Sequence, residues 1–149
     1  MKKLIIGLFL CLSLIFVPFL VHAAGTVTVT TLNYGQGYWR VRYAWTADAS
    51  DGSVPATASG AILGYVILAV TDPGATSPTD GYAVTITDDN SVDVFGGELG
   101  DLDEANTEQW VPKIDSVYGP RFVSGTLTLN LSGNVVNSAT GTLDLYIVR

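Results

Sequence analysis

The chain has almost no cysteine or histidine: its 149 residues contain one of each, Cys11 and His22. Both lie within the first 23 residues, so residues 24–149 contain neither. A Ser-His-Asp or Cys-His catalytic arrangement requires one of these side chains, and so do conventional zinc and copper sites. Residues 24–149 therefore exclude those enzymes and metal sites, and they cannot form an internal disulfide.

Basic residues are also scarce. The chain has 7 Lys and Arg against 14 Asp and Glu. Without Lys2 and Lys3, five basic residues remain against the same 14 acids, a formal net charge of −9. Binding to nucleic acids or anionic membranes depends on clustered Lys and Arg. This balance predicts neither kind of partner and favours a soluble, acidic domain.

The N-terminal segment has the pattern of a signal peptide. Lys2 and Lys3 precede an apolar run over residues 4–21, and Val21-His22-Ala23 forms an acceptable cleavage site before Ala24. We predict a signal peptide over residues 1–23, one domain over residues 24–149, and export to the periplasm, cell surface or medium. The alternative is a retained anchor, because an apolar run of about 18 residues can span a bilayer.

The rest of the chain has the alternation of β-strands. The clearest case is Tyr38–Thr46, where Trp39, Val41, Tyr43 and Trp45 fall on one face, which predicts core. We expect a strand buried on both faces over residues 61–70, a hairpin of 82–87 with 92–95, and a terminal hairpin of 127–131 with 143–147. These short strands predict an all-β fold, a single antiparallel β-sandwich of jelly-roll or immunoglobulin-like type.

Residues 96–119 are the least regular stretch. We expect a long loop there, with a helical turn somewhere within Asp101–Trp110 that ends before Pro112. Long loops in compact domains tend to carry function, so contacts with partners are expected in this stretch.

The acidic residues allow one metal hypothesis. Asp88, Asn90 and Asp93 could present several oxygen ligands to calcium from a single loop. They do not match the EF-hand loop, and a solvated hairpin turn is the interpretation we favour. No spacing of Asp or Glu singles out a catalytic pair. We therefore predict no enzymatic activity and no cofactor.

Two tyrosines are candidate binding residues. Tyr34 and Tyr38 lie in the first turn or opposite the predicted core face. Exposed aromatic rings can stack on sugars or anchor a partner chain.

Turn and strand motifs between residues 39 and 149 suggest a family. The chain resembles the small β-rich virion structural proteins of tailed bacteriophages and prophages in its aromatic strand Trp39–Trp45 and in the following segments: Pro73-Gly74, Pro78-Thr79-Asp80, Tyr82, Val84-Thr85-Ile86-Thr87-Asp88, Asp93-Val94, Asn106-Thr107-Glu108, Leu127-Thr128-Leu129 and Gly141-Thr142-Leu143-Asp144-Leu145-Tyr146. The resemblance implies a non-enzymatic decoration or adaptor subunit, with protein partners, self-association or a virion or surface assembly. The alternative is a secreted bacterial surface-binding module for carbohydrate or adhesion.

Overall fold

The computed structural model describes residues 22–149. Most of the predicted signal peptide, residues 1–21, lies outside this part of the chain. Residues 22–149 contain no helix, and hence none long and apolar enough to cross a membrane. All strand pairings are antiparallel, which confirms the predicted all-β antiparallel class.

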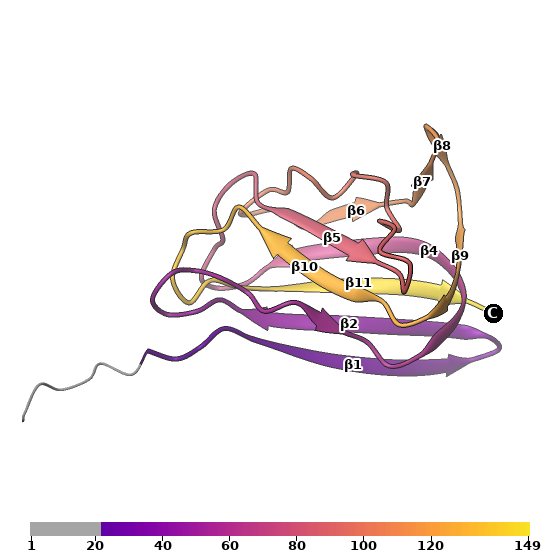
Figure 1. The fold of residues 1–149 in the computed structure, drawn as a ribbon, viewed down its shortest axis with the longest axis horizontal. Coiled ribbons are helices and arrows are strands. Elements are labelled where there is room, and N and C mark those ends of the chain that lie inside the picture. The colour runs from indigo at the N-terminus through magenta and orange to yellow at the C-terminus, as the bar shows by residue number, and fades with distance from the viewer. Residues whose placement is uncertain (1–21) are drawn as a thin grey trace, which may run out of the picture.

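A large sheet forms one side of the domain. Its strands are β1 (Thr26–Gly35), β2 (Tyr38–Thr46), β4 (Ile62–Pro73), β6 (Glu108–Trp110), β9 (Arg121–Gly125) and β11 (Thr140–Val148). The order is β1-β2-β11-β4-β6, and β9 pairs with an earlier part of β4. Figure 1 shows β1 at the free edge of this sheet.

A smaller sheet lies in front of the large one in Figure 1. It has the order β3-β10-β5 and consists of β3 (Thr57–Ala58), β5 (Ala83–Thr87) and β10 (Thr128–Ser132). A separate hairpin of β7 (Lys113–Ile114) and β8 (Val117–Tyr118) projects from the domain, and we call it the arm.

The predicted inward face of β2 is confirmed. Val41, Tyr43 and Trp45 are buried, and Trp39 is half-buried against the same core. The core cluster combines these side chains with others from both sheets, among them Leu145, Ile86 and Leu129. The two sheets therefore share one hydrophobic core, which burial of apolar surface stabilises.

One buried hydroxyl links the two sheets. The Tyr43 hydroxyl donates a 2.6 Å hydrogen bond to the Leu127 carbonyl, just before β10. Burial raises the pKa of Tyr43 to about 12, because the interior disfavours the phenolate. The bond satisfies a polar group within the core and fixes the approach of β10 to β2.

The predicted terminal hairpin is wrong. β10 belongs to the small sheet, whereas β11 pairs with β2 and β4 in the large sheet. The connection passes buried Asn134, whose amide donates to the Gly52 carbonyl and accepts from the Thr79 N–H. Both strands alternate apolar and polar residues because both face the same core, but they do so from opposite sheets.

Two other local predictions need correction, and a third, the hairpin of residues 82–87 with 92–95, is confirmed in part. The outer face of β4 is open, since Leu63 and Tyr65 are exposed. No helical turn forms in residues 101–110, because Glu108–Trp110 pairs with β4 as β6. Residues 92–95 return beside β5 without forming a full strand. Asp93 forms an antiparallel bridge with Thr87, and the Val94 N–H donates to the Ile86 carbonyl.

Candidate interaction surface

The outer face of the large sheet carries side chains in rows that cross several strands. One row follows directly from the register: Tyr38 lies opposite Val148, Val148 opposite Tyr65, and Tyr65 opposite Phe122. Directly opposed residues point to the same face of a sheet. The row therefore places three aromatic rings from three different strands on one surface.

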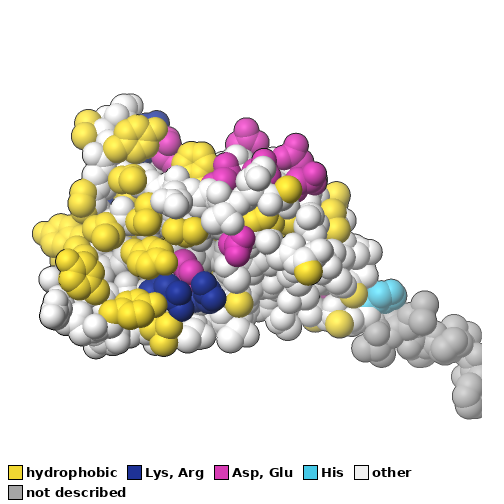
Figure 2. All heavy atoms as spheres, turned by 180° about the vertical axis from the view of Figure 1, so that it is seen from behind, with side chains coloured by type: hydrophobic (Ala, Val, Ile, Leu, Met, Phe, Trp, Pro, Cys, Tyr) yellow, Lys and Arg dark blue, Asp and Glu magenta, His cyan; other side chains and the backbone are white. Residues whose placement is uncertain are grey.

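This row belongs to a larger apolar surface at one end of the sheet. We call it the aromatic patch and define it by six exposed residues: Leu32, Tyr34, Tyr38, Leu63, Tyr65 and Phe122. Figure 2 views the large sheet from outside and shows hydrophobic side chains gathered at the end away from the cyan histidine. The rings of Tyr65 and Phe122 pack edge to face with centroids 5.3 Å apart. Such packing stabilises the rings in place as a contact surface.

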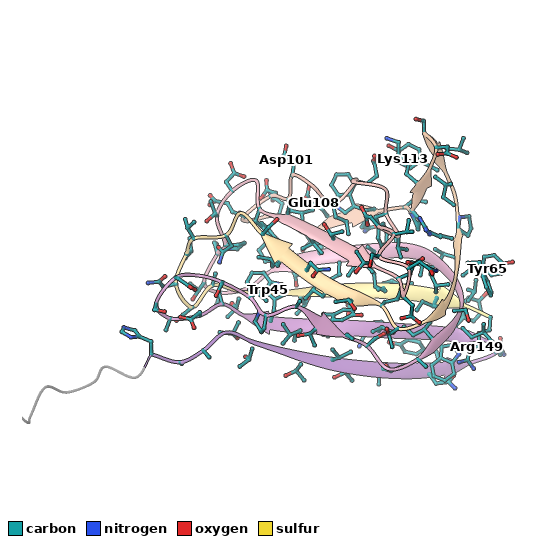
Figure 3. All side chains as sticks on the ribbon, in the orientation of Figure 1. Trp45, Tyr65, Asp101, Glu108, Lys113 and Arg149 are labelled. Atoms are coloured by element: carbon teal, nitrogen blue, oxygen red, sulfur yellow. The ribbon has the colours of Figure 1, made fainter. Side chains whose placement is uncertain are left out.

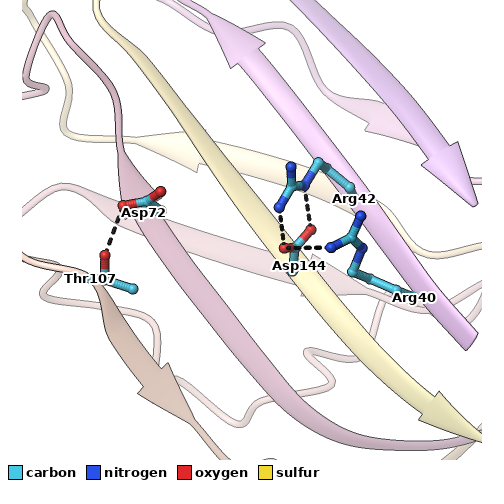
Figure 4. Close-up of polar contacts among 5 residues, drawn as sticks. All are labelled: Arg40, Arg42, Asp72, Thr107 and Asp144. Carbon is cyan, nitrogen blue, oxygen red and sulfur yellow. Dashed lines mark hydrogen bonds and ion pairs between the residues drawn. The ribbon is translucent and has the colours of Figure 1, made fainter. Parts of the chain in front are cut away.

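An ion cluster borders the aromatic patch. Asp144 accepts hydrogen bonds from Nε and Nη2 of Arg42, at 2.7 and 2.6 Å, and lies 3.8 Å from Nη1 of Arg40 (Figure 4). The cluster forms because Arg42 and Asp144 are opposed in the β2–β11 register. The hydrogen bond to Asp144 raises the pKa of Arg42. Arg40 also lies over the Tyr34 ring, 6.0 Å from its centroid, which connects the cluster to the patch.

A groove of about 580 Å³ adjoins the patch at Phe122. It lies between the arm and the loop after β5, and its lining consists of Val92, Asp93, Gly96, Lys113, Ile114, Asp115, Arg121 and Phe122. Arg121 is held within the fold, because Nη1 donates to the Asp93 carbonyl and Nη2 lies 3.7 Å from Asp88. The groove thus extends the apolar surface of the patch towards the arm.

The arm is held by a carboxylate of the domain body. Glu98 accepts hydrogen bonds from Lys113 Nζ and from the Tyr118 hydroxyl, both at 2.7 Å. Asp115 and Ser116 have positive φ values of 46° and 70°, the conformation of a tight two-residue hairpin turn. Figure 3 shows Lys113 on the arm, above the end that carries Tyr65 and Arg149. Val117 and Tyr118, on the second strand of the arm, are exposed.

We expect acid to release the arm. The hydrogen bonds from Lys113 and Tyr118 lower the pKa of Glu98. Its stabilising contribution is therefore complete above the pKa of an unfolded glutamate and is lost as pH falls through the lowered value. NMR signals of the Tyr118 ring should shift with a midpoint below the ordinary pKa of glutamate.

The variant Glu98→Gln should abolish that transition, whereas Glu104→Gln, at another exposed acid, should preserve it. A Tyr118 signal that titrates equally in the Glu98→Gln variant would show that Glu98 does not hold the arm.

The three calcium candidates occupy turns. Oδ1 of Asp88 accepts from the N–H groups of Asn90 and Val92, and the Asp93 carboxylate accepts from those of Phe95 and Gly97. These bonds stabilise local turns, as Asp commonly does. Within residues 22–149, no three His, Cys, Asp or Glu side chains converge as a metal site would require.

The structure exposes both predicted binding tyrosines. Tyr34 and Tyr38 are 59% and 55% exposed on either side of the β1–β2 turn. Their role in binding stays a prediction. Sequence reasoning missed Tyr65 and Phe122, because the strand containing Tyr65 looked buried on both faces and Phe122 lies beyond the irregular stretch. The only available signal was an aromatic residue one or two positions after a glycine or proline, Tyr65 after Gly64 and Phe122 after Pro120.

No known protein family, curated protein or solved structure matches this chain. The functional argument therefore rests on the chemistry and placement of the surface.

Proposed function

We propose that this protein is an exported, non-enzymatic structural protein that assembles with other protein chains through the aromatic patch. The observation that carries the proposal is the row of exposed rings Tyr38, Tyr65 and Phe122 across the large sheet. Contiguous exposed apolar surface marks interaction sites. Tyr, Phe and Arg are enriched in protein interfaces, whereas Lys is depleted.

The position of the patch suits an exported subunit. The patch lies near the β1–β2 turn, whereas β1 begins at Thr26 at the other end of the sheet, and all six patch residues follow Ala23 in the sequence, so cleavage there would remove none of them. The proposal includes cleavage after Ala23 and a β-sandwich architecture, which the common core of the two sheets supports. The resemblance to virion subunits favours a decoration or adaptor role, on a particle or on a cell surface.

The charged side chains beside the groove support a contact role more than a catalytic one. Arg121 binds a backbone carbonyl, Lys113 binds Glu98, and Asp93 caps its own turn. Each of these groups already stabilises a loop or the arm. A catalytic acid or base would instead have to be available to a substrate bound in the groove.

Fractionation of producing cells tests the proposal. Mass spectrometry should find the wild-type protein in particles or envelope assemblies, with a peptide that begins at Ala24. The variant Tyr65→Ser/Phe122→Ser should move to the unassembled fraction while remaining folded. Val135→Ser is the matched control, because Val135 is 71% exposed but lies outside the patch. A wild-type protein that occurs only as unassembled, single chains would contradict the assembly role.

A second candidate is a secreted module that binds surface carbohydrate. It is favoured by the exposed rings of Tyr34 and Tyr38 and by Arg40 beside Tyr34, since aromatic platforms with a nearby donor can hold sugars. A glycan array should then show binding that Tyr34→Ala/Tyr38→Ala abolishes and that Tyr118→Ala, at an exposed ring on the arm, retains. An array without binding removes this candidate.

A further inference from the structure

The free edge of β1 lacks the protection that edge strands usually have. Within residues 22–149, β1 pairs with β2 alone. It is ten residues long, TVTVTTLNYG, without a charge or a proline, and its register with β2 is regular from Thr26 to Asn33. Half of its backbone N–H and C=O groups point away from β2, as in any antiparallel edge. Such an edge is a template for another strand.

The other sheet edges of this domain are short or covered. β6 and β3 have three and two residues. β9 has five and begins at Arg121. On the free side of β5, the Val84 N–H donates to the Leu99 carbonyl and the Ile86 carbonyl accepts from the Val94 N–H, so neighbouring loop segments cover this edge. Natural proteins protect edges by shortness, charge or a covering segment. Since β1 alone has none of these devices, we expect its edge to be occupied in the working protein.

We propose that β1 pairs with β1 of a second copy of this chain, antiparallel about a two-fold axis near Val29, to give one sheet that continues through both copies. In this register Thr28 lies opposite Thr30 of the other copy and Val29 opposite Val29. Val27, Val29 and Thr31 stay on the inner face in both copies, as they do in the pairing with β2. Thr–Thr and β-branched pairs stabilise antiparallel strands, and a symmetric pair satisfies both edges at once.

Charge placement does not oppose this dimer. Arg42 lies opposite Thr30, next to the axis, and Arg40 lies opposite Leu32, but both arginines are paired with Asp144 of their own copy. β1 itself carries no charged side chain, so the two edges meet without like charges. The inference deepens the proposed assembly role and rests on it, but it concerns a different surface from the aromatic patch.

Analytical ultracentrifugation of the protein purified from exporting cells tests the pairing. The wild type should sediment as a dimer, and Thr28→Lys/Thr30→Lys should raise the dimer dissociation constant about tenfold or more, because lysines then oppose each other in two symmetric positions. Gln109→Lys/Ser124→Lys adds the same charge at exposed positions on β6 and β9, away from β1, and should leave the dimer intact. A monomeric wild type, or an unaffected lysine variant, would overturn the inference.

Disulfide cross-linking provides a second test, in which pairing of the two strands produces a new covalent dimer. Single cysteines at residues 27–31 should give an oxidised dimer with its maximum at residue 29, whereas Ser124→Cys on β9 should not. A maximum on β9, or equal yields at all positions, would contradict the β1 pairing. Tyr65→Ser/Phe122→Ser should keep the dimer but lose the larger assembly. Failure of the β1 pairing is thereby distinguished from failure of the proposed function.

Discussion

Replacing Trp45 with alanine is expected to lower the free energy of unfolding by about 3–5 kcal/mol, the usual range for a large buried aromatic residue. The Trp45 side chain is buried between the sheets, and its ring centroid lies 6.0 Å from that of Tyr82 (Figure 3). The loss is a large part of the total stability of a domain of this size. Urea denaturation should show it, and Thr46→Ala, at the exposed neighbouring position, should change stability by no more than about 0.5 kcal/mol.

Gly141 makes this prediction more specific. A Cβ atom at residue 141 would lie 2.5 Å from Cζ2 of Trp45, so Gly141→Ala should by itself destabilise by about 1–3 kcal/mol. In the Trp45→Ala background the ring is absent, and the same change should cost much less. Additive effects of the two substitutions would show that residues 45 and 141 do not pack as the β2–β11 register places them.

Replacing Asp144 with asparagine should destabilise the large sheet by about 2–3 kcal/mol. The Asp144 side chain is only 7% exposed and holds two arginines from β2. Asparagine keeps the shape but removes the charge, which leaves Arg40 and Arg42 without their counterion. Removal of one partner from a fully buried pair costs roughly 3–5 kcal/mol. The value here is lower because the Arg42 side chain is 40% exposed and water screens it.

Asp72→Asn is the matched control for this variant. Asp72 is an exposed residue of the neighbouring strand β4, where it accepts a hydrogen bond from the Thr107 hydroxyl (Figure 4). The same substitution there should change stability by about 0.5 kcal/mol or less. Equal denaturation midpoints for the Asp144→Asn and wild-type proteins would contradict the structural role of the ion cluster.

The alternation of apolar and polar residues along a strand could be predicted from local sequence. The predicted inward face of β2 was correct for this reason. Val41, Tyr43 and Trp45 are buried because side chains in a strand point alternately to two sides. Alternation does not specify the sheet to which a strand belongs. The terminal segments were therefore paired with each other in our prediction, although β10 and β11 lie in different sheets.

The candidate surface depends on register between distant segments, which local patterns do not contain. Phe122 meets Tyr65 because β9 pairs with β4, and Asp144 is buried because Arg42, 102 residues earlier, lies opposite it. An extra residue in β4, Ile67, shifts its pairing with β11 between Leu68 and Val66. This bulge changes which side chains of β4 face outward, and the apolar sequence of the strand concealed it.

Site-specific photo-crosslinking in producing cells tests the central claim most directly. A photoreactive residue at position 122, in the aromatic patch, should give discrete cross-linked species that Tyr65→Ser weakens. The same residue at position 135, exposed but outside the patch, should give none. Cross-links at position 135 alone, or at neither position, would contradict assembly through the aromatic patch.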